Sequence, residues 1–144
     1  YLHGTWLEEF AWLQLEPLLA DGRLCDLGCG VCIDYDEAER LCDGQQTAQD
    51  LDLATTDGYE LIILECKSGR FDQTTIQKLE NNATLYGGSF GRGVLVATKP
   101  PPSHGSDRRR IEESASMRAF CDEAVVSNLR DHLLDRSRTR VWIH

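Results

Sequence analysis

The sequence predicts an α/β domain in which a mixed central sheet is flanked by helices. An amphipathic segment opens the chain, two strands joined by a tight turn follow, and a helix then leads into another apolar strand. The tight turn requires an antiparallel pair, whereas a strand, a helix and a second strand in that order are typical of a parallel crossover. With 144 residues, of which 41% are hydrophobic, the chain is long enough for one domain with its own core.

The first element is a helix that begins near Thr5, where Thr5 and Glu8 fit a capping box. We expect Pro17 to end or kink this helix. Trp6, Phe10 and Leu13 follow helical spacing, and Leu7 and Ala11 flank them. Residues 23–35 then alternate like a strand, and residues 36–47 are polar and predict a loop.

A β-hairpin follows, with strands at residues 50–54 and 61–67. Its turn contains Asp57-Gly58, a dipeptide typical of two-residue hairpin loops. If these two residues form the whole loop, Thr56 faces Tyr59 and the register of the hairpin is set.

In that register Asp52 pairs with Ile63, and Glu65 lies two residues further along the same face. Lys67 is two residues beyond Glu65 and points the same way. The hairpin therefore predicts two carboxylates and one ammonium on one side of the sheet. Asp50 shares this face and is either a further acid or a surface residue.

Two carboxylates at one place favour a divalent metal site. Mg²⁺ takes oxygen ligands, usually one or two carboxylates with water and substrate phosphate. Without a cation the two carboxylates would repel each other, and an ion bound there lowers the pKa of its water to give a nucleophile. A neighbouring ammonium stabilises charge that develops on a phosphate, so Asp52, Glu65 and Lys67 predict phosphodiester hydrolysis.

The remaining elements follow from periodicity and turn residues. A helix over 72–86 ends at Gly87-Gly88, and residues 93–98 form a buried strand. Residues 99–107 contain three prolines and predict an exposed loop. The C-terminal part is expected to hold helices over 109–123 and 127–136 and short strands over 124–126 and 141–143.

Both the order of elements and the local motifs resemble the restriction-endonuclease-like PD-(D/E)xK nuclease superfamily. They are most similar to the branch that includes the C-terminal nuclease domains of CRISPR ancillary effectors activated by cyclic oligoadenylate. The matching motifs are Gly4-Thr5-Trp6-Leu7-Glu8, Asp50-Leu51-Asp52-Leu53, Ile63-Leu64-Glu65-Cys66-Lys67, Ile76-Gln77-Lys78-Leu79-Glu80 and Gly87-Gly88. Asp50 stands where this branch often has glutamate.

The resemblance implies a restriction-endonuclease-like core and metal-dependent cleavage of DNA or RNA. Asp52 and Glu65 would then bind Mg²⁺ or Mn²⁺, with the backbone carbonyl of Cys66 as a further ligand by its position. It also makes Glu8 an active-site acid, although the capping box explains Glu8 equally well. The polar helix residues Lys78 and Gln77 would lie near the substrate phosphate, and Lys78 is the preferred candidate.

At the level of the whole protein, we expect residues 1–144 to form a single nuclease-like domain of a larger protein, since the chain opens at Tyr1. The resemblance implies a sensor domain elsewhere in that protein, and its members often act as homodimers. The sequence has no membrane-length apolar run and no signal peptide. Six cysteines in a chain with an ordinary core predict a reduced, cytoplasmic protein.

The net charge of −9 opposes strong nucleic-acid binding by the domain alone. The run Arg108-Arg109-Arg110 is either a solvated helix start or a phosphate contact. An alternative function is a catalytically inactive scaffold or dimerisation domain that has kept the nuclease fold.

Four cysteines, Cys25, Cys29, Cys32 and Cys42, suggest a third possibility, a zinc or iron–sulfur site. Their spacing matches no common zinc ribbon, and we expect buried apolar cysteines instead. The histidines His3, His104, His132 and His144 have no partner at ligand spacing and are expected at the surface.

Overall fold

A five-stranded mixed sheet forms the centre of the computed structural model, which describes residues 5–34, 48–101, 105–121 and 129–134. In order across the sheet, the strands are β1 (Asp26–Asp34), β2 (Ala48–Thr56), β3 (Leu61–Lys67), β4 (Gly91–Ala97) and β5 (Met117–Cys121). β1, β2 and β3 pair antiparallel, whereas β3, β4 and β5 pair parallel. The predicted mixed sheet is confirmed.

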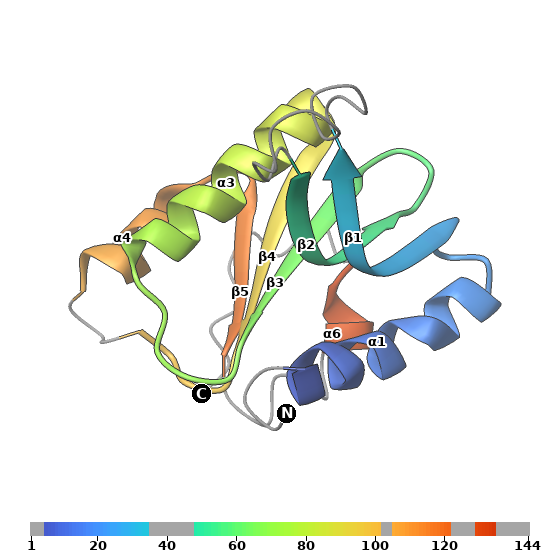
Figure 1. The fold of residues 1–144 in the computed structure, drawn as a ribbon, viewed down its shortest axis with the longest axis horizontal. Helices are drawn as coiled ribbons and strands as arrows, with labels where there is room; N and C mark the ends of the chain where they lie inside the picture. Colours follow the sequence, from blue (N-terminus) through green and yellow to red (C-terminus); the bar gives the residue numbers. More distant parts are fainter. Residues whose placement is uncertain (1–4, 35–47, 102–104, 122–128, 135–144) are drawn as a thin grey trace, which may run out of the picture.

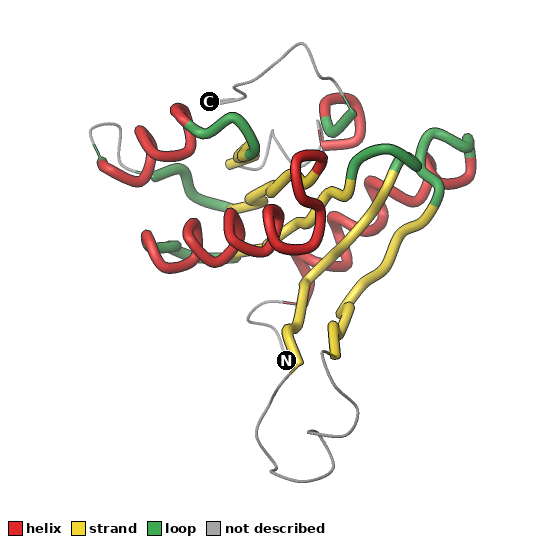
Figure 2. Tube along the Cα trace, turned by 90° about the horizontal axis from the view of Figure 1, so that it is seen from above, coloured by secondary structure: helices red, strands yellow, loops and turns green. Residues whose placement is uncertain are grey.

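Helices cover both faces of this sheet, so the domain has three layers (Figures 1 and 2). One face carries α1 (Thr5–Ala20) and α6 (Leu129–His132), and the other carries α3 (Gln73–Gly87) and α4 (Ser106–Glu113). A short 3₁₀ turn, η1 (Gly88–Phe90), joins α3 to β4. Each face has its own apolar core, which we call the α1 core and the α3 core.

The predicted N-terminal helix is confirmed as α1, and only one of its two apolar stripes is buried. Trp6, Phe10 and Leu13 are exposed, and the residues against the sheet are Leu7, Ala11, Leu15 and Leu18. Both stripes have helical spacing, so periodicity alone could not choose between them. The helix also continues through Pro17 to Ala20. The proline removes one helical hydrogen bond, whose acceptor would be the carbonyl of the exposed Leu13.

The C-terminal part of the sheet differs from the prediction of one helix over 109–123. The helix α4 ends at Glu113, and β5 follows, buried along its whole length beside β4. A short apolar strand with both faces covered shows no alternation, so its pattern does not separate strand from helix. α6 lies within the predicted helix 127–136, while the strands predicted at 124–126 and 141–143 fall outside the described residues.

The helix α3 has the predicted boundaries. The Asp72 carboxylate caps its N-terminus by accepting a hydrogen bond of 3.0 Å from the Thr75 amide. At the other end Gly88 takes a positive φ of 58°, which glycine adopts without strain. Gly91 follows where β4 passes close to α3, since a Cβ there would lie 1.8 Å from the Ala83 carbonyl oxygen.

The hairpin between β2 and β3 has a longer loop than predicted. Thr56 pairs with Leu61 instead of Tyr59, so residues 57–60 form the loop. The Asp57 carboxylate accepts hydrogen bonds from the amides of Tyr59 and Glu60, at 2.9 and 2.8 Å, which stabilises this wider turn. The register therefore shifts by two residues, and an even shift keeps the paired residues of the hairpin on their predicted faces.

Candidate active site

The predicted site lies where β2 and β3 separate. Leu53 and Leu64 are the last paired residues, so Asp52 follows on one strand and Glu65 on the other. Beyond this pair the Cys66 amide donates a hydrogen bond of 2.8 Å to the Asp52 Oδ2 atom. The carboxylate of Asp52 thus takes the place of a backbone acceptor and is held between the two strands.

β2 twists at Asp52. Leu53 packs in the α1 core and Leu51 packs in the α3 core, although strand residues two apart normally share a face. On the neighbouring strand β1, Gly30 has a positive φ of 59° and lies between Cys29 and Val31, which pair with Leu53 and Leu51. Figure 1 shows the two strands curling from the sheet toward α3.

Glu65 and Lys67 form an ion pair on the face of β3 that carries the α3 core. The Lys67 Nζ and Glu65 Oε1 atoms are 2.8 Å apart, and the two side chains are 36% and 8% exposed. In the sheet Glu65 is paired with Leu95, which belongs to the α3 core. A carboxylate buried this deeply needs a charged partner, and Lys67 supplies it.

The electrostatics of the site show an excess of negative charge. Burial raises the pKa of Asp52, with a further rise from the negative charge of Glu65, and the hydrogen bond from the Cys66 amide opposes these effects. Burial would lower the pKa of the Lys67 ammonium, but its hydrogen bond to Glu65 and the charges of Glu65 and Asp52 reverse the direction and raise it.

Glu8 of α1 belongs to the same cluster. Its pKa is raised by burial and then by the negative charges of Asp52 and Glu65, so its carboxylate lies within electrostatic range of both. The fold therefore brings Glu8 within electrostatic range of Asp52, Glu65 and Lys67. Because Glu8 precedes Asp52 by 44 residues (52 − 8), this proximity is a product of the fold.

The two candidate substrate residues on α3 differ in position. Both Lys78 and Gln77 are exposed. The positive charge of Lys78 lowers the pKa of Asp52, so its ammonium reaches the edge of the cluster. No hydrogen bond or ion pair joins Gln77 to these carboxylates within the described residues.

The donor types at the site suit a hard divalent cation. Asp52 and Glu65 offer carboxylate oxygens, and Cys66, which follows Glu65 in the chain, offers a backbone carbonyl oxygen. Burial and then neighbouring negative charge raise the pKa of Glu8 and of Asp52, and a divalent cation bound beside them would favour their charged forms. The Cys66 side chain does not contribute, because burial raises the pKa of its thiol far above neutrality.

The cysteine prediction was wrong in one respect. Cys25, Cys29 and Cys32 are free and exposed instead of buried, and Cys42 lies outside the described residues. Over the part of the chain that is described, no group of three or more His, Cys, Asp or Glu side chains is arranged to hold a metal ion. Cys29 was missed as a neighbour of the site, since its thiol pKa is raised by burial and by Glu8 and Asp52.

Two solved structures resemble this fold. Protein VC1899 from Vibrio cholerae superposes with a TM-score of 0.72 at 25% identity, covering 89% of this chain and 32% of that protein. Can2 from Sulfobacillus thermosulfidooxidans, solved in complex with cyclic tetra-adenylate, superposes with a TM-score of 0.69 at 19% identity. That match covers 91% of this chain and 35% of Can2. The chain thus spans about a third of each protein.

No curated protein matches the sequence. In the described residues, no helix combines the length and apolar character that a membrane span requires. The α/β architecture, with its five-stranded mixed sheet, is the restriction-endonuclease-like fold of the Can2 and Card1 structures. Residues 1–140 match the family described as Card1-like, endonuclease domain, and the chain therefore belongs to that family.

Proposed function

We propose that this domain hydrolyses phosphodiester bonds of DNA or RNA in a reaction that depends on Mg²⁺ or Mn²⁺. One observation carries the proposal: Asp52, Glu65 and Lys67 lie where the pairing of β2 and β3 ends. Two acids and one cation in this arrangement suit phosphoryl chemistry better than a structural role, because their mutual repulsion destabilises the cation-free fold.

Each residue has a distinct part in this proposal. Asp52, Glu65 and the Cys66 carbonyl would hold the ion, which lowers the pKa of a bound water and offsets phosphate charge. The Cys66 amide orients Asp52 through its 2.8 Å hydrogen bond. Glu65 holds the Lys67 ammonium at 2.8 Å, so that it can donate to the attacking water or to a phosphate oxygen. Glu8 would support the outer shell of the ion, where its carboxylate could accept a hydrogen bond from bound water.

Binding of a nucleic-acid substrate needs positive charge, and this domain has 15 lysine and arginine residues against 24 acidic residues. Lys78, with Gln77 beside it on α3, would contact the phosphate next to the one that is cleaved. The net charge of −9 makes binding by the domain alone weak. We therefore propose that residues 1–144 are one nuclease domain of a longer, homodimeric protein, whose sensor domain binds a cyclic oligoadenylate like the one in the Can2 complex.

The test is a cleavage assay on labelled single- and double-stranded DNA and RNA with Mg²⁺, Mn²⁺ or EDTA. We expect cleavage with a divalent ion and none in EDTA. Lys67→Ala should reduce the rate by at least about a hundredfold. Because it also removes the charged partner of the buried Glu65 carboxylate, its melting temperature should fall in EDTA, and its activity is compared with wild type at a temperature where circular dichroism shows both to be folded. Arg109→Ala is the matched control, because Arg109 is an exposed cation whose ion pair is within α4. Full activity of Lys67→Ala would refute the proposed role.

Thermal melting separates this proposal from an inactive scaffold. Mn²⁺ should raise the melting temperature of the wild-type domain, since an ion that binds only the folded state stabilises it. Glu65→Gln should remove the effect by deleting one ligand. A domain that shows neither cleavage nor a Mn²⁺ response would be a scaffold that has kept the fold.

A further inference from the structure

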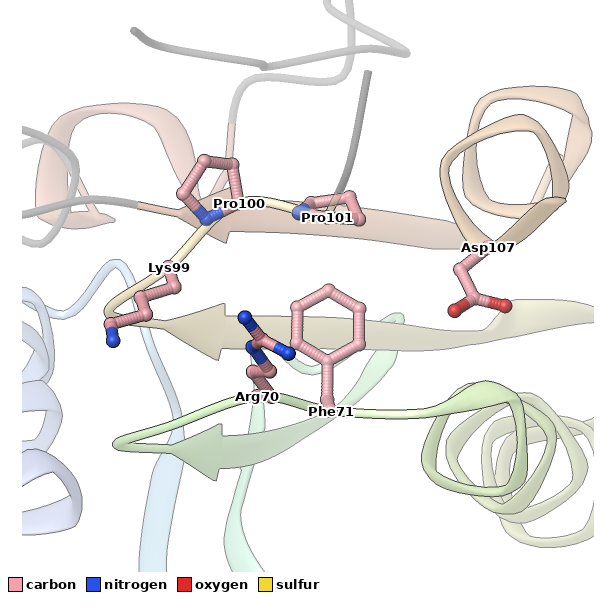
Figure 3. A pocket seen from close by; sticks show the side chains of 6 residues that line it. All are labelled: Arg70, Phe71, Lys99, Pro100, Pro101 and Asp107. Carbon is pink, nitrogen blue, oxygen red and sulfur yellow. The ribbon is translucent and has the colours of Figure 1, made fainter. Parts of the chain in front are cut away.

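A pocket of about 530 Å³ opens between the loops that follow β3 and β4 (Figure 3). This volume is within the range of sites that hold small organic molecules. Its lining residues are Arg70, Phe71, Lys99, Pro100, Pro101 and Asp107. None of the predicted site residues lines it, so the pocket is a separate feature of the surface.

The pocket adjoins the proposed active site. The Thr98 amide donates to the Lys67 carbonyl at 3.1 Å, and the Thr98 hydroxyl donates to the Ser68 carbonyl at 2.9 Å, which ties the two loops together. Arg70 follows Lys67 by three residues, a span of at most about 11 Å. The pocket also lies at the carboxyl ends of parallel strands, where α/β sheets bind ligands.

The lining combines one aromatic ring with both signs of charge. In Figure 3 the Phe71 ring lies between Arg70 and Asp107, with the two prolines across the opening. Phe71 is half-buried and packs against the α3 core, which fixes its position. Arg70, Lys99 and Asp107 form no ion pair with one another or with any other residue in the described ranges. Their charges remain available to a ligand.

We propose that this pocket holds one nucleotide of the substrate strand, with its base unstacked and with guanine preferred. The proposal rests on the nuclease function of the adjacent site. The base stacks on Phe71, as unpaired bases do on exposed aromatic rings. Arg70 and Lys99 contact the phosphates on either side of that base.

Guanine is preferred because of Asp107. A carboxylate is an acceptor on both oxygens, so it pairs best with two adjacent N–H donors. Guanine presents such a pair on its Watson–Crick edge, at N1 and N2. Adenine and cytosine present one amino group beside an acceptor nitrogen, and thymine and uracil present one N–H between two carbonyl oxygens. Only guanine satisfies both oxygens without placing an acceptor against them.

The first test measures binding by the cleavage-deficient Glu65→Gln variant in Mg²⁺. The probes are short thymidine oligonucleotides with or without one central guanosine, and their binding is measured by fluorescence anisotropy. We expect the guanosine probe to bind about tenfold more tightly. Asp107→Asn should abolish that preference, whereas the matched control Glu113→Gln, an exposed acid at the other end of α4, should keep it. Equal affinity for both probes, or binding of neither, overturns the proposal.

Two further variants test the ring and the cations. Phe71→Leu keeps the apolar contact with the core but removes the stacking surface, so both probes should bind about tenfold more weakly with little change in melting temperature. Substituting both Arg70 and Lys99 by alanine removes two phosphate contacts. The plot of log affinity against log salt concentration should then become less steep by about 1.4. An unchanged salt dependence of the double variant would contradict the two phosphate contacts. An unchanged affinity of Phe71→Leu for both probes would contradict the stacking of the base on Phe71.

Mapping cleavage positions with the wild-type domain and Mn²⁺ separates the two proposals. If the wild-type domain cuts at a fixed distance from guanosine and Asp107→Asn cuts at random positions, both the nuclease function and the guanine pocket are supported. If the cleavage positions of Asp107→Asn and of Phe71→Leu are the same as those of the wild-type domain, the guanine pocket is refuted and the nuclease function is still supported. Selective binding of the guanosine probe without cleavage supports the pocket and refutes the nuclease function.

Discussion

Charge repulsion decides the properties of the site at the scale of single residues. Glu8, Asp52 and Glu65 are the three acids of the cluster, and Lys67 is paired directly with only one of them. Burial and mutual repulsion raise the pKa of Glu8 and of Asp52, which means that the folded state holds their protons more tightly than the unfolded chain does. The site therefore costs stability at neutral pH when no cation is bound.

Asp52→Asn should stabilise the domain at pH 7 in EDTA. The unfolded carboxyl loses its proton near pH 3.9, and the folded one only at a higher pH. Stability is therefore lost as pH rises between these two values, and the full loss persists above them. Asparagine avoids this loss and can still accept the hydrogen bond from the Cys66 amide. Melting temperatures across pH 3.5–8 would show a gap between variant and wild type that closes below about pH 4.

Asp50→Asn is the control for this comparison, because Asp50 is an exposed aspartate of the same strand. It should leave the wild-type pH profile unchanged. A wild-type domain more stable than Asp52→Asn at pH 7 in EDTA would contradict the electrostatic description of the site.

The crossing of α3 and β4 supports the site at the scale of elements. β4 pairs with β3 through Glu65 and Lys67, so its position determines where both residues lie. Gly91 begins β4 against the Ala83 carbonyl of α3, with no room for a side chain. The close approach lets the helix cover the α3 core, to which Leu79 and Leu95 contribute.

Gly91→Ala should destabilise the domain by about 2–4 kcal/mol, because the new Cβ would lie 1.8 Å from one backbone atom of Ala83 and 2.7 Å from another. Gly91 has an ordinary extended φ of −82°, so the cost comes from the clash alone. Urea denaturation measures it. Gly69→Ala is the control, since nothing lies within 4 Å of a Cβ there and the change should stay within about 0.5 kcal/mol. Equal stability of the two variants would show that α3 moves freely on β4.

At the scale of the whole molecule, the buried Arg92 of β4 connects segments that are distant in the chain. Its guanidinium donates a hydrogen bond of 2.9 Å to the Leu133 carbonyl and lies 3.2 Å from the Glu60 carboxylate. These contacts connect the sheet with the segment that follows α6 and with the hairpin loop. A charge at this depth is retained only when it is compensated from several directions.

Arg92→Met should lower stability by roughly 2–3 kcal/mol, because it leaves Glu60 and the Leu133 carbonyl without this partner. The cost is below that of a fully buried pair, since the Glu60 side chain is 20% exposed and keeps contact with water. Calorimetry measures the loss. Arg130→Met, at an exposed arginine of α6, should have a negligible effect. If Arg92→Met did not change the stability, an apolar contact would be able to replace the ion pair of Arg92 with Glu60.

Local order along the chain made the mixed sheet, the α3 helix and the shared face of Asp52, Glu65 and Lys67 predictable. A strand alternates every two residues, so the spacing of these residues defines their face, and even the wrong hairpin register preserved it because the error was two residues. The N-terminal cap at Asp72 and the glycines after α3 are equally local.

Tertiary structure alone decided which stripe of α1 is buried and that residues 117–121 form β5. It also decided that Glu8 lies within electrostatic range of Asp52 and Glu65, and that the pocket lined by Phe71 forms next to the loop after β3. Two faces of one helix, or a strand and a helix with the same apolar run, differ little in local free energy. The choice between them depends on which arrangement buries the most apolar surface against elements distant in the chain, and a local pattern does not contain that comparison.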